Sequence, residues 1–407
     1  MQLEPIFTRF AEFVIMRQIR PEISAEKIIA KFSIKVKLVF LFSAMLLRIE
    51  SEMKQFRLCK NHKRCVIRVV SCLLCLCLSF ALAACGEAKM EQSNVFAMDT
   101  IMTLTAYGKN AEKGLASAES VIRSMEAQLD PELPTSTVYA INNANGASVV
   151  VSSQVAKMLS TAKTVYDQSD GALDLSIYPL IKLWGFIDGK YYVPQDVEIS
   201  AAMMKFGFDK MILTSYPATG SWSVSFPAGT ELSFGAIGKG CTAENVIDAM
   251  RQAGVSSGII SLGGNVQTLG LKPDGSKWSV AIQDPNNPSS YLGVVSVGEI
   301  AVVTSGTYQR YFEHDGNIYH HLLNPATGYP ASNNLRSVTV ICEDGTMADA
   351  LSTALFVLGE GKALNYWRAN KGFEMIMVTK SNRVICTSGL IEEFTLTNEN
   401  YSVSYSE

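Results

Sequence analysis

An aspartate and a threonine lie four residues apart in the otherwise small and apolar stretch ADALSTALFVLG, residues 348–359. On a helix, this spacing places the side chains of Asp349 and Thr353 on one face, one turn apart. A buried carboxylate is costly unless a partner compensates its charge. The pair predicts a site for Mg²⁺, which prefers oxygen ligands and needs further ones here. The alternative is a helix cap, because Asp349 is early in its helix, or a hydrogen-bonded helix aspartate.

Two glycine-rich stretches could bring backbone atoms close to a ligand. FGAIGKG, residues 234–240, precedes a predicted helix over 242–253 and contains Lys239. Free N–H groups at a helix start, together with a lysine, favour an anion site, although a tight turn explains the glycines equally. The spacing matches neither a P-loop nor a dinucleotide-binding fingerprint. SLGGN, residues 261–265, allows close backbone approach or forms a β-bulge or hairpin turn.

After residue 84 the chain contains three histidines, and all lie within 314–321. His320 and His321 are adjacent, so on a strand they face opposite sides. We therefore expect one to face a site and the other solvent. The turn-forming NPATGYP that follows, residues 324–330, would hold this strand end rigid. His321 is a candidate acid or base, or alternatively an ordinary surface or core histidine.

The elements that must position these residues alternate between helical and strand periods. This mixture, with hairpin turns between strands, predicts a single large α+β domain over 95–407 with a mostly antiparallel sheet. Helices are predicted at 110–129, 154–169, 242–253 and 346–358. Strands are predicted at 95–107, 207–213, 222–226, 231–234, 258–262, 266–271, 278–282, 302–304, 310–313, 335–341, 374–379 and 383–388.

Charge and cysteine are unevenly distributed along the 407 residues. Residues 1–84 hold 14 Lys and Arg against 6 Asp and Glu, a net charge of +8. Because the whole chain has a net charge of −3, the body, residues 85–407, has a net charge of −11. An acidic body argues against a nucleic-acid partner, whose phosphates require a basic surface. Six of nine cysteines lie within 59–85. The remaining three, Cys241, Cys342 and Cys386, are predicted to be buried small hydrophobes rather than a disulfide framework or zinc site.

Residues 53–85 have the pattern of a secretory signal. A basic region follows Met53, residues 69–84 are apolar and uncharged, and the run ends in Leu-Ala-Ala-Cys. It resembles a bacterial lipoprotein signal, so we expect a signal peptide at 53–84, a lipid on Cys85 and a tether to residue 94. An uncleaved membrane anchor is the alternative, and both place the body outside the cytoplasm. Residues 1–52 are interpreted as a non-native or disordered extension, with Met53 as the true start.

Seven motifs in order resemble the ApbE family, the FAD:protein FMN transferases. They are FAMDT (96–100), GALDLSIYPLIKLWGF (171–186), FGAIGKG (234–240), SLGGNV (261–266), TSGTYQRYF (304–312), YHHLLNPATGYP (319–330) and ADALSTALFVLG (348–359). The resemblance implies a T-fold-like architecture. It also implies Mg²⁺-dependent transfer of FMN from FAD to a Thr or Ser hydroxyl of a target flavoprotein, as a phosphoester, with release of AMP. The acceptor would lie in an Asp/Ser-Gly-Ala-Ser/Thr-type motif of an extracytoplasmic electron-transport protein.

The same resemblance assigns site residues. The metal ligands that it implies are the side chains of Asp349 and Thr353 and the backbone carbonyl of Ala236. His321 is the expected acid or base. The FAD contacts are Met98, Ala172, Leu173, Asp174, Ser233, Lys239 and Leu322. Two other readings stay open: an FAD pyrophosphatase that releases FMN and AMP, and a non-catalytic lipoprotein that binds flavin or another solute.

Four positions depart from the family pattern. Asp99 replaces a glycine and adds charge near the expected flavin, and Ser233 replaces an aspartate and weakens a polar contact. Thr307 replaces the aspartate of T-S-G-D. Asn324 stands where the His-Ile-x-Asp-Pro pattern has an aspartate, which removes a charge.

Overall fold

A nine-stranded sheet runs through residues 89–407, the part of the chain that the computed structural model describes, and these residues belong to one compact unit, Glu87–Glu407. The predicted extension, the signal peptide and Cys85 lie outside the described residues. The strand order is β1-β2-β6-β7-β10-β13-β14-β15-β17. Neighbours are antiparallel except for the parallel pair β15–β17, which confirms the predicted α+β class with a largely antiparallel sheet.

The strands of this sheet are short to medium in length. They are β1 (Met90–Ala97), β2 (Thr100–Tyr107), β6 (Gly258–Leu262), β7 (Asn265–Leu269), β10 (Ala301–Gly306), β13 (Leu335–Cys342), β14 (Phe373–Thr379), β15 (Arg383–Thr387) and β17 (Ser402–Ser406). Smaller sheets contain β3 (Val149–Val151), β5 (Ser221–Ser225) and β4 (Ile212–Tyr216); β16 (Phe394–Leu396), β9 (Asn287–Val297) and β8 (Trp278–Asp284); and β11 (Tyr311–His314) with β12 (Asn317–His320).

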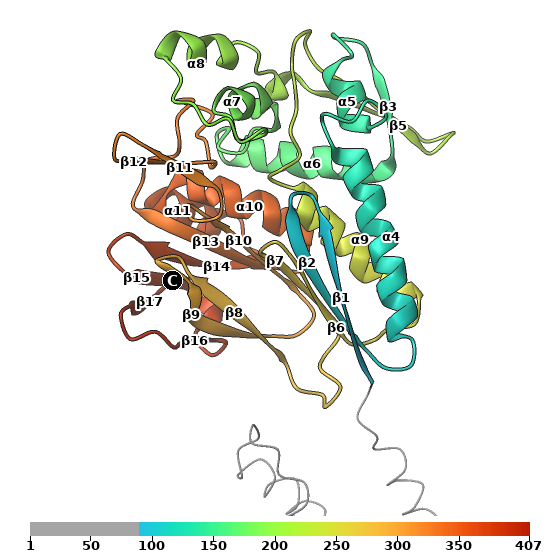
Figure 1. Ribbon diagram of the computed structural model, residues 1–407, viewed down its shortest axis with the longest axis vertical. Coiled ribbons are helices and arrows are strands. Elements are labelled where there is room, and N and C mark those ends of the chain that lie inside the picture. The colour runs from blue at the N-terminus through green and yellow to red at the C-terminus, as the bar shows by residue number, and fades with distance from the viewer. Residues whose placement is uncertain (1–88) are drawn as a thin grey trace, which may run out of the picture. The chain divides into compact units, whose positions relative to one another are not determined.

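Helices cover one face of the large sheet, and the β16-β9-β8 sheet covers the other (Figure 1). The helices are α4 (Ala111–Leu129), α5 (Thr137–Asn142), α6 (Ser153–Gln168), α7 (Tyr178–Leu183), α8 (Asp196–Met203), α9 (Gly238–Gln252), α10 (Gly345–Leu358) and α11 (Glu360–Ala369). In α4, buried residues recur every three or four positions and form the stripe that packs on α9, β1 and β2. Because α10 packs against α6, α9, β10 and β13, it is buried almost all round.

Two of the predicted helices nearest the site match closely, but the start of α9 does not. The α10 helix begins at Gly345 and ends at Leu358, before Gly359, whose φ of 76° suits only a glycine without strain. Residues 154–169 were predicted helical, and α6 spans Ser153–Gln168. The α9 helix starts at Gly238, four residues before the prediction, so its first turn contains Lys239 and Gly240. Glycine-rich sequence disfavours helix locally, and packing against α10 overrides that preference.

Several strand predictions are wrong. The expected strand over 95–107 is a hairpin, β1–β2, whose turn residues Met98 and Asp99 have φ values of 49° and 59°. Its first strand already begins at Met90, so residues 90–94 belong to the sheet and not to a tether. Residues 231–234 form a loop, residues 207–213 contain a 3₁₀ turn (Phe208–Lys210), and the long strand β9 was missed.

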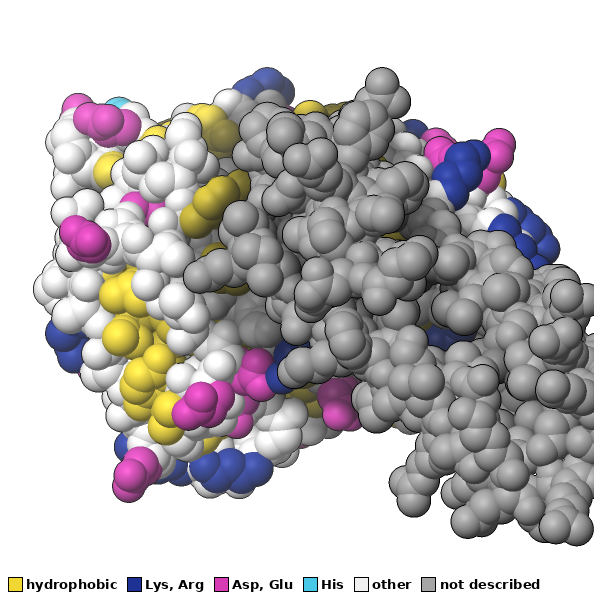
Figure 2. Space-filling view, turned by 90° about the horizontal axis from the view of Figure 1, so that it is seen from below, with side chains coloured by type: hydrophobic (Ala, Val, Ile, Leu, Met, Phe, Trp, Pro, Cys, Tyr) yellow, Lys and Arg dark blue, Asp and Glu magenta, His cyan; other side chains and the backbone are white. Residues whose placement is uncertain are grey.

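The described surface mixes apolar and polar side chains. In Figure 2, hydrophobic side chains gather in a band at the left of the view, with acidic and basic side chains below it. Within residues 89–407, no helix has the length and apolar character needed to cross a bilayer. Cys241, Cys342 and Cys386 are buried free thiols, as predicted from their scattered positions.

Candidate functional site

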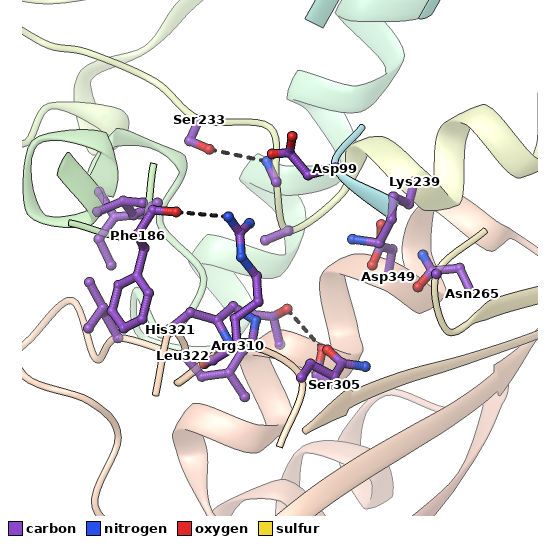
Figure 3. Close-up of a pocket in the computed structure, with 18 of the residues that line it drawn as sticks. Asp99, Phe186, Ser233, Lys239, Asn265, Ser305, Arg310, His321, Leu322 and Asp349 are labelled. Carbon is purple, nitrogen blue, oxygen red and sulfur yellow. Dashed lines mark hydrogen bonds between the residues drawn. The ribbon is translucent and has the colours of Figure 1, made fainter. Parts of the chain in front are cut away.

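One cavity of about 470 Å³ brings together all the residues that the sequence assigned to a site. It lies where the β1–β2 turn, the loop before α9, the start of β7, the end of β10 and one face of α10 meet (Figure 3). The predicted residues in its wall are Met98, Ala172, Leu173, Asp174, Ser233, Ala236, Lys239, His321, Leu322, Asp349 and Thr353. Their roles remain predictions, but their assembly from segments spread over 256 positions of the sequence is a property of the fold.

Asp349 is 3% exposed and does not cap its own helix. The N-cap of α10 is Asp344, whose side chain accepts the Met347 N–H at 2.7 Å, so the capping alternative is wrong. Instead, Oδ2 of Asp349 accepts the backbone N–H of Gly240 at 2.8 Å, in the first turn of α9, which confirms the alternative of a hydrogen-bonded helix aspartate. The positive end of α9 therefore compensates part of the cost of burying this carboxylate. Within residues 89–407, Oδ1 has no hydrogen-bond or ion-pair partner.

Two cations line the cavity and have no carboxylate partner among the described residues. Lys239, half-buried in the first turn of α9, makes no ion pair there. Arg310 donates from Nη2 to the carbonyl of Phe186 at 2.8 Å, which holds its guanidinium across the cavity (Figure 3). The predicted anion site before α9 is thus partly filled by Asp349 itself. The remaining positive charge comes from side chains, which favours an anionic ligand.

The oxygen atoms around Asp349 suit a hard cation. Oγ1 of Thr353 and Oγ of Ser305 are 3.2 Å apart, and Ser305 also bonds Ser352 at 2.8 Å. The carbonyl of Ala236 accepts no hydrogen bond from residues 89–407. Carboxylate, hydroxyl and carbonyl oxygens are the ligands of Mg²⁺, which often takes few ligands from protein and the rest from phosphate and water. In the described part of the chain, no three His, Cys, Asp or Glu residues cluster closely enough to hold a metal alone.

His321 is held as a neutral imidazole. Its Nδ1 lies 3.1 Å from the carbonyl oxygen of Arg310, and because a carbonyl only accepts, Nδ1 carries the hydrogen and Nε2 a lone pair. Burial, with the nearby charges of Arg310 and Lys239, lowers the pKa of His321 to about 3. His320 is buried against Phe356, so the expectation that one histidine of the pair faces solvent is wrong.

Other predicted contacts shape the cavity wall through local hydrogen bonds. Asp174 accepts the N–H and the hydroxyl of Ser176 at 2.7 and 2.6 Å, and burial raises its pKa. Ser233 accepts the Gly235 N–H at 3.2 Å. Asn324 accepts the Ala326 N–H at 2.9 Å, so its amide oxygen maintains the turn without the charge of the family's aspartate.

The chain matches the family model described as "ApbE family" over residues 98–377, a span that includes every residue of this cavity. The chain belongs to the ApbE family. The FAD:protein FMN transferase of Klebsiella pneumoniae is 36% identical over 285 residues, which cover 70% of this chain and 87% of that protein. The FAD:protein FMN transferase of Treponema pallidum is 30% identical over 345 residues, covering 80% of this chain and 94% of that protein.

Solved ApbE structures share the fold. The ApbE protein of Thermotoga maritima superposes with a TM-score of 0.67 at 27% identity, covering 73% of this chain and 96% of that one. The apo form of the flavinyl transferase ApbE of Pseudomonas stutzeri gives a TM-score of 0.64 at 29% identity, covering 73% and 93%. The expected ApbE-like architecture is therefore confirmed.

Sequence reasoning did not single out four polar residues that this ApbE cavity contains: Asn265, Ser305, Tyr308 and Arg310. All lie in motifs that were recognised as stretches, SLGGNV and TSGTYQRYF. The sequence does not show which polar side chains find a hydrogen-bond or ion-pair partner. An arginine or asparagine in a hairpin region usually finds a partner, and only the tertiary structure shows that Asn265 Nδ2 and the Arg310 charge lack one in the described residues.

Gly240 sets the distance between α9 and α10 in this ApbE protein. A Cβ at this position would lie 2.1 Å from the carbonyl oxygen of Gly345 and 2.6 Å from Cβ of Asp349. Gly240→Ala is therefore expected to push the helices apart and to lower the free energy of unfolding by about 1–3 kcal/mol, measured by urea denaturation. Gly361→Ala in α11 is the control, because its Cβ would meet no atom within 4 Å. Equal stability of the two variants would contradict this packing argument.

Proposed function

We propose that this protein transfers FMN from FAD to a Thr or Ser hydroxyl of a target flavoprotein, forming a phosphoester and releasing AMP. The observation that carries the proposal is one cavity that joins a carboxylate oxygen of Asp349 to two cations, Lys239 and Arg310, and none of these has an oppositely charged partner within residues 89–407. Such a cavity suits a diphosphate. The names of the relatives, FAD:protein FMN transferase, support the same reaction.

The donor oxygens fit a divalent cation, which we propose is Mg²⁺ held by Asp349, Thr353 and the Ala236 carbonyl. Bound there, it would neutralise charge on the phosphate oxygens, the main demand of phosphoryl transfer. Lys239 adds a second positive charge from the first turn of α9. The cavity walls at Met98, Ala172–Asp174, Ser233 and Leu322 are proposed to contact the rest of FAD.

His321 is proposed to act as the base that accepts the proton of the acceptor hydroxyl. The hydrogen bond between Nδ1 and the Arg310 carbonyl leaves the lone pair on Nε2 free for that task. When water replaces the hydroxyl, the same groups would hydrolyse FAD to FMN and AMP. The pyrophosphatase reading therefore differs from transfer only in the acceptor.

The location and partners are also proposals. A lipid on Cys85 would tether the body to the outer face of the cell membrane, near flavoproteins of extracytoplasmic electron transport. The acceptor would carry an Asp/Ser-Gly-Ala-Ser/Thr-type motif. Mass spectrometry of the mature N-terminus tests the lipid, and an unmodified chain that retains residues 69–84 would refute it.

One experiment separates the three readings. Residues 86–407 are incubated with FAD, Mg²⁺ and a peptide that bears the acceptor motif, and the products are separated. Flavin fluorescence fixed to the peptide supports transfer, free FMN without labelled peptide supports hydrolysis, and unchanged FAD supports a binding protein and contradicts the proposal.

Asp99 is expected to weaken the binding of FAD. It lines the cavity at the β1–β2 turn, is exposed, and has no cationic partner within residues 89–407. Asp99→Gly removes this charge, and glycine adopts its φ of 59° freely, so FAD should bind about 2- to 5-fold more tightly at low salt. Titration of FAD fluorescence at low and high salt measures this effect, which should shrink as salt rises. Weaker binding by Asp99→Gly would show that the carboxylate contacts the ligand favourably.

A further inference from the structure

Asn265 is a buried amide with an unused donor. It is the first residue of β7, is 2% exposed, and its Nδ2 has no hydrogen-bond partner among residues 89–407. Buried polar groups in native proteins are nearly always paired, because an unmade hydrogen bond costs the full desolvation of the group. An unpaired amide at a cavity wall is a candidate to bind a ligand in that cavity.

The amide of Asn265 lies at the charged part of the cavity. Asn265 lines the cavity, and in Figure 3 its amide end points toward Asp349 and Lys239. The side chain of Asp349 already accepts the Gly240 N–H, and no hydrogen bond joins it to Asn265. A ligand placed between these residues would supply the acceptor that Nδ2 lacks.

The backbone beneath Asn265 is fixed. Residues Leu262 and Val303 are its partners on the two neighbouring strands, β6 and β10. Gly263 has a φ of 60°, and a Cβ there would lie 2.5 Å from Oγ1 of Thr100. The backbone of Asn265 is thus held in place before any ligand binds, which reduces the entropic cost of binding.

We propose that Asn265 binds the diphosphate of the dinucleotide by donating an Nδ2–H hydrogen bond to a phosphate oxygen. This inference rests on the proposed function for its ligand. A neutral donor suits this position. It makes a hydrogen bond to a phosphate oxygen, while Lys239 and a cation at Asp349 neutralise the negative charge of the diphosphate. Asn265 is then a binding residue of the site, distinct from the metal ligands and from His321.

The test compares Asn265→Leu with a matched control in the same strand. Gln267→Met removes another buried amide whose Oε1 is also unpartnered but which does not line the cavity. Binding of FAD and of riboflavin, which has no phosphate, is measured by flavin fluorescence with EDTA present. Asn265→Leu should weaken FAD about 10- to 100-fold and leave riboflavin unchanged. Gln267→Met should bind both as the wild type does.

A thermal melt without ligand accompanies the binding assay. Because leucine leaves no donor unpaired, Asn265→Leu should melt at or above the wild-type temperature, which separates lost binding from lost folding. Unchanged FAD affinity in Asn265→Leu, or equal weakening of FAD and riboflavin, would overturn the inference.

Asn265→Asp distinguishes a phosphate contact from a cation contact. The carboxylate should repel the diphosphate and weaken FAD more than leucine does, whereas tighter Mg²⁺ binding would mean that position 265 faces the cation and would refute the proposal. Wild-type turnover with FAD is assayed in parallel. An inactive wild type defeats the proposed function, while an active wild type with an unaffected Asn265→Leu variant defeats only this inference.

Discussion

Asp349→Asn is expected to lower metal-dependent turnover of FAD by about 10³-fold or more, because it removes the carboxylate that is proposed to hold the dication. The asparagine oxygen still accepts the Gly240 N–H, so the contact between α9 and α10 and the fold are retained. Turnover is measured as AMP release over a series of Mg²⁺ concentrations. The half-saturating Mg²⁺ concentration should rise with the loss of activity.

The matched control for this variant is Asp344→Asn. It changes an aspartate on the same helix that caps α10 and does not line the cavity. Because asparagine is as good an N-cap as aspartate, the control should keep both its stability and its turnover. Full activity of Asp349→Asn at low Mg²⁺ would remove the metal assignment.

His321→Asn is expected to reduce kcat for transfer to a peptide acceptor by about 10²- to 10⁴-fold, the usual contribution of a positioned base. The asparagine amide can replace Nδ1 as the donor to the Arg310 carbonyl, but it has no lone pair that accepts a proton at neutral pH. FAD affinity should change little. A kcat close to that of the wild type would exclude His321 as the base.

The pH profile gives a second readout for His321. A histidine with a pKa lowered to about 3 stays neutral throughout pH 5–8. The wild-type kcat/KM, which reports the free enzyme, should accordingly show no acid limb near pH 6.5. A limb near 6.5 that disappears in His321→Asn would show that the ring titrates at its ordinary value and would contradict the lowered pKa inferred for the cation-flanked ring.

Local sequence periodicity predicted much of the framework. The α4, α6 and α10 helices differ from their predicted spans by no more than one residue at either end, and β6 matches its prediction. These elements carry a clear apolar period and end at caps or turns that act within a few residues. The missed strand β9 begins with polar, exposed residues and pairs with β8 and β16, the latter far along the chain. Its local sequence therefore lacks the alternation that marks a half-buried strand.

The sequence by itself determined the family, the fold class and the eleven residues that meet at the cavity, because ordered motifs preserve residue type and spacing. Only the tertiary structure decided how these residues are paired. The N–H that Asp349 accepts comes from Gly240, 109 residues away in the chain, and the turn at Met98 and Asp99 depends on β1 pairing with β2. The tertiary structure likewise decides that the Nδ2 donor of Asn265 has no partner among residues 89–407. Whether a buried polar group is satisfied depends on atoms that folding brings near it, and spacing along the chain does not encode those contacts.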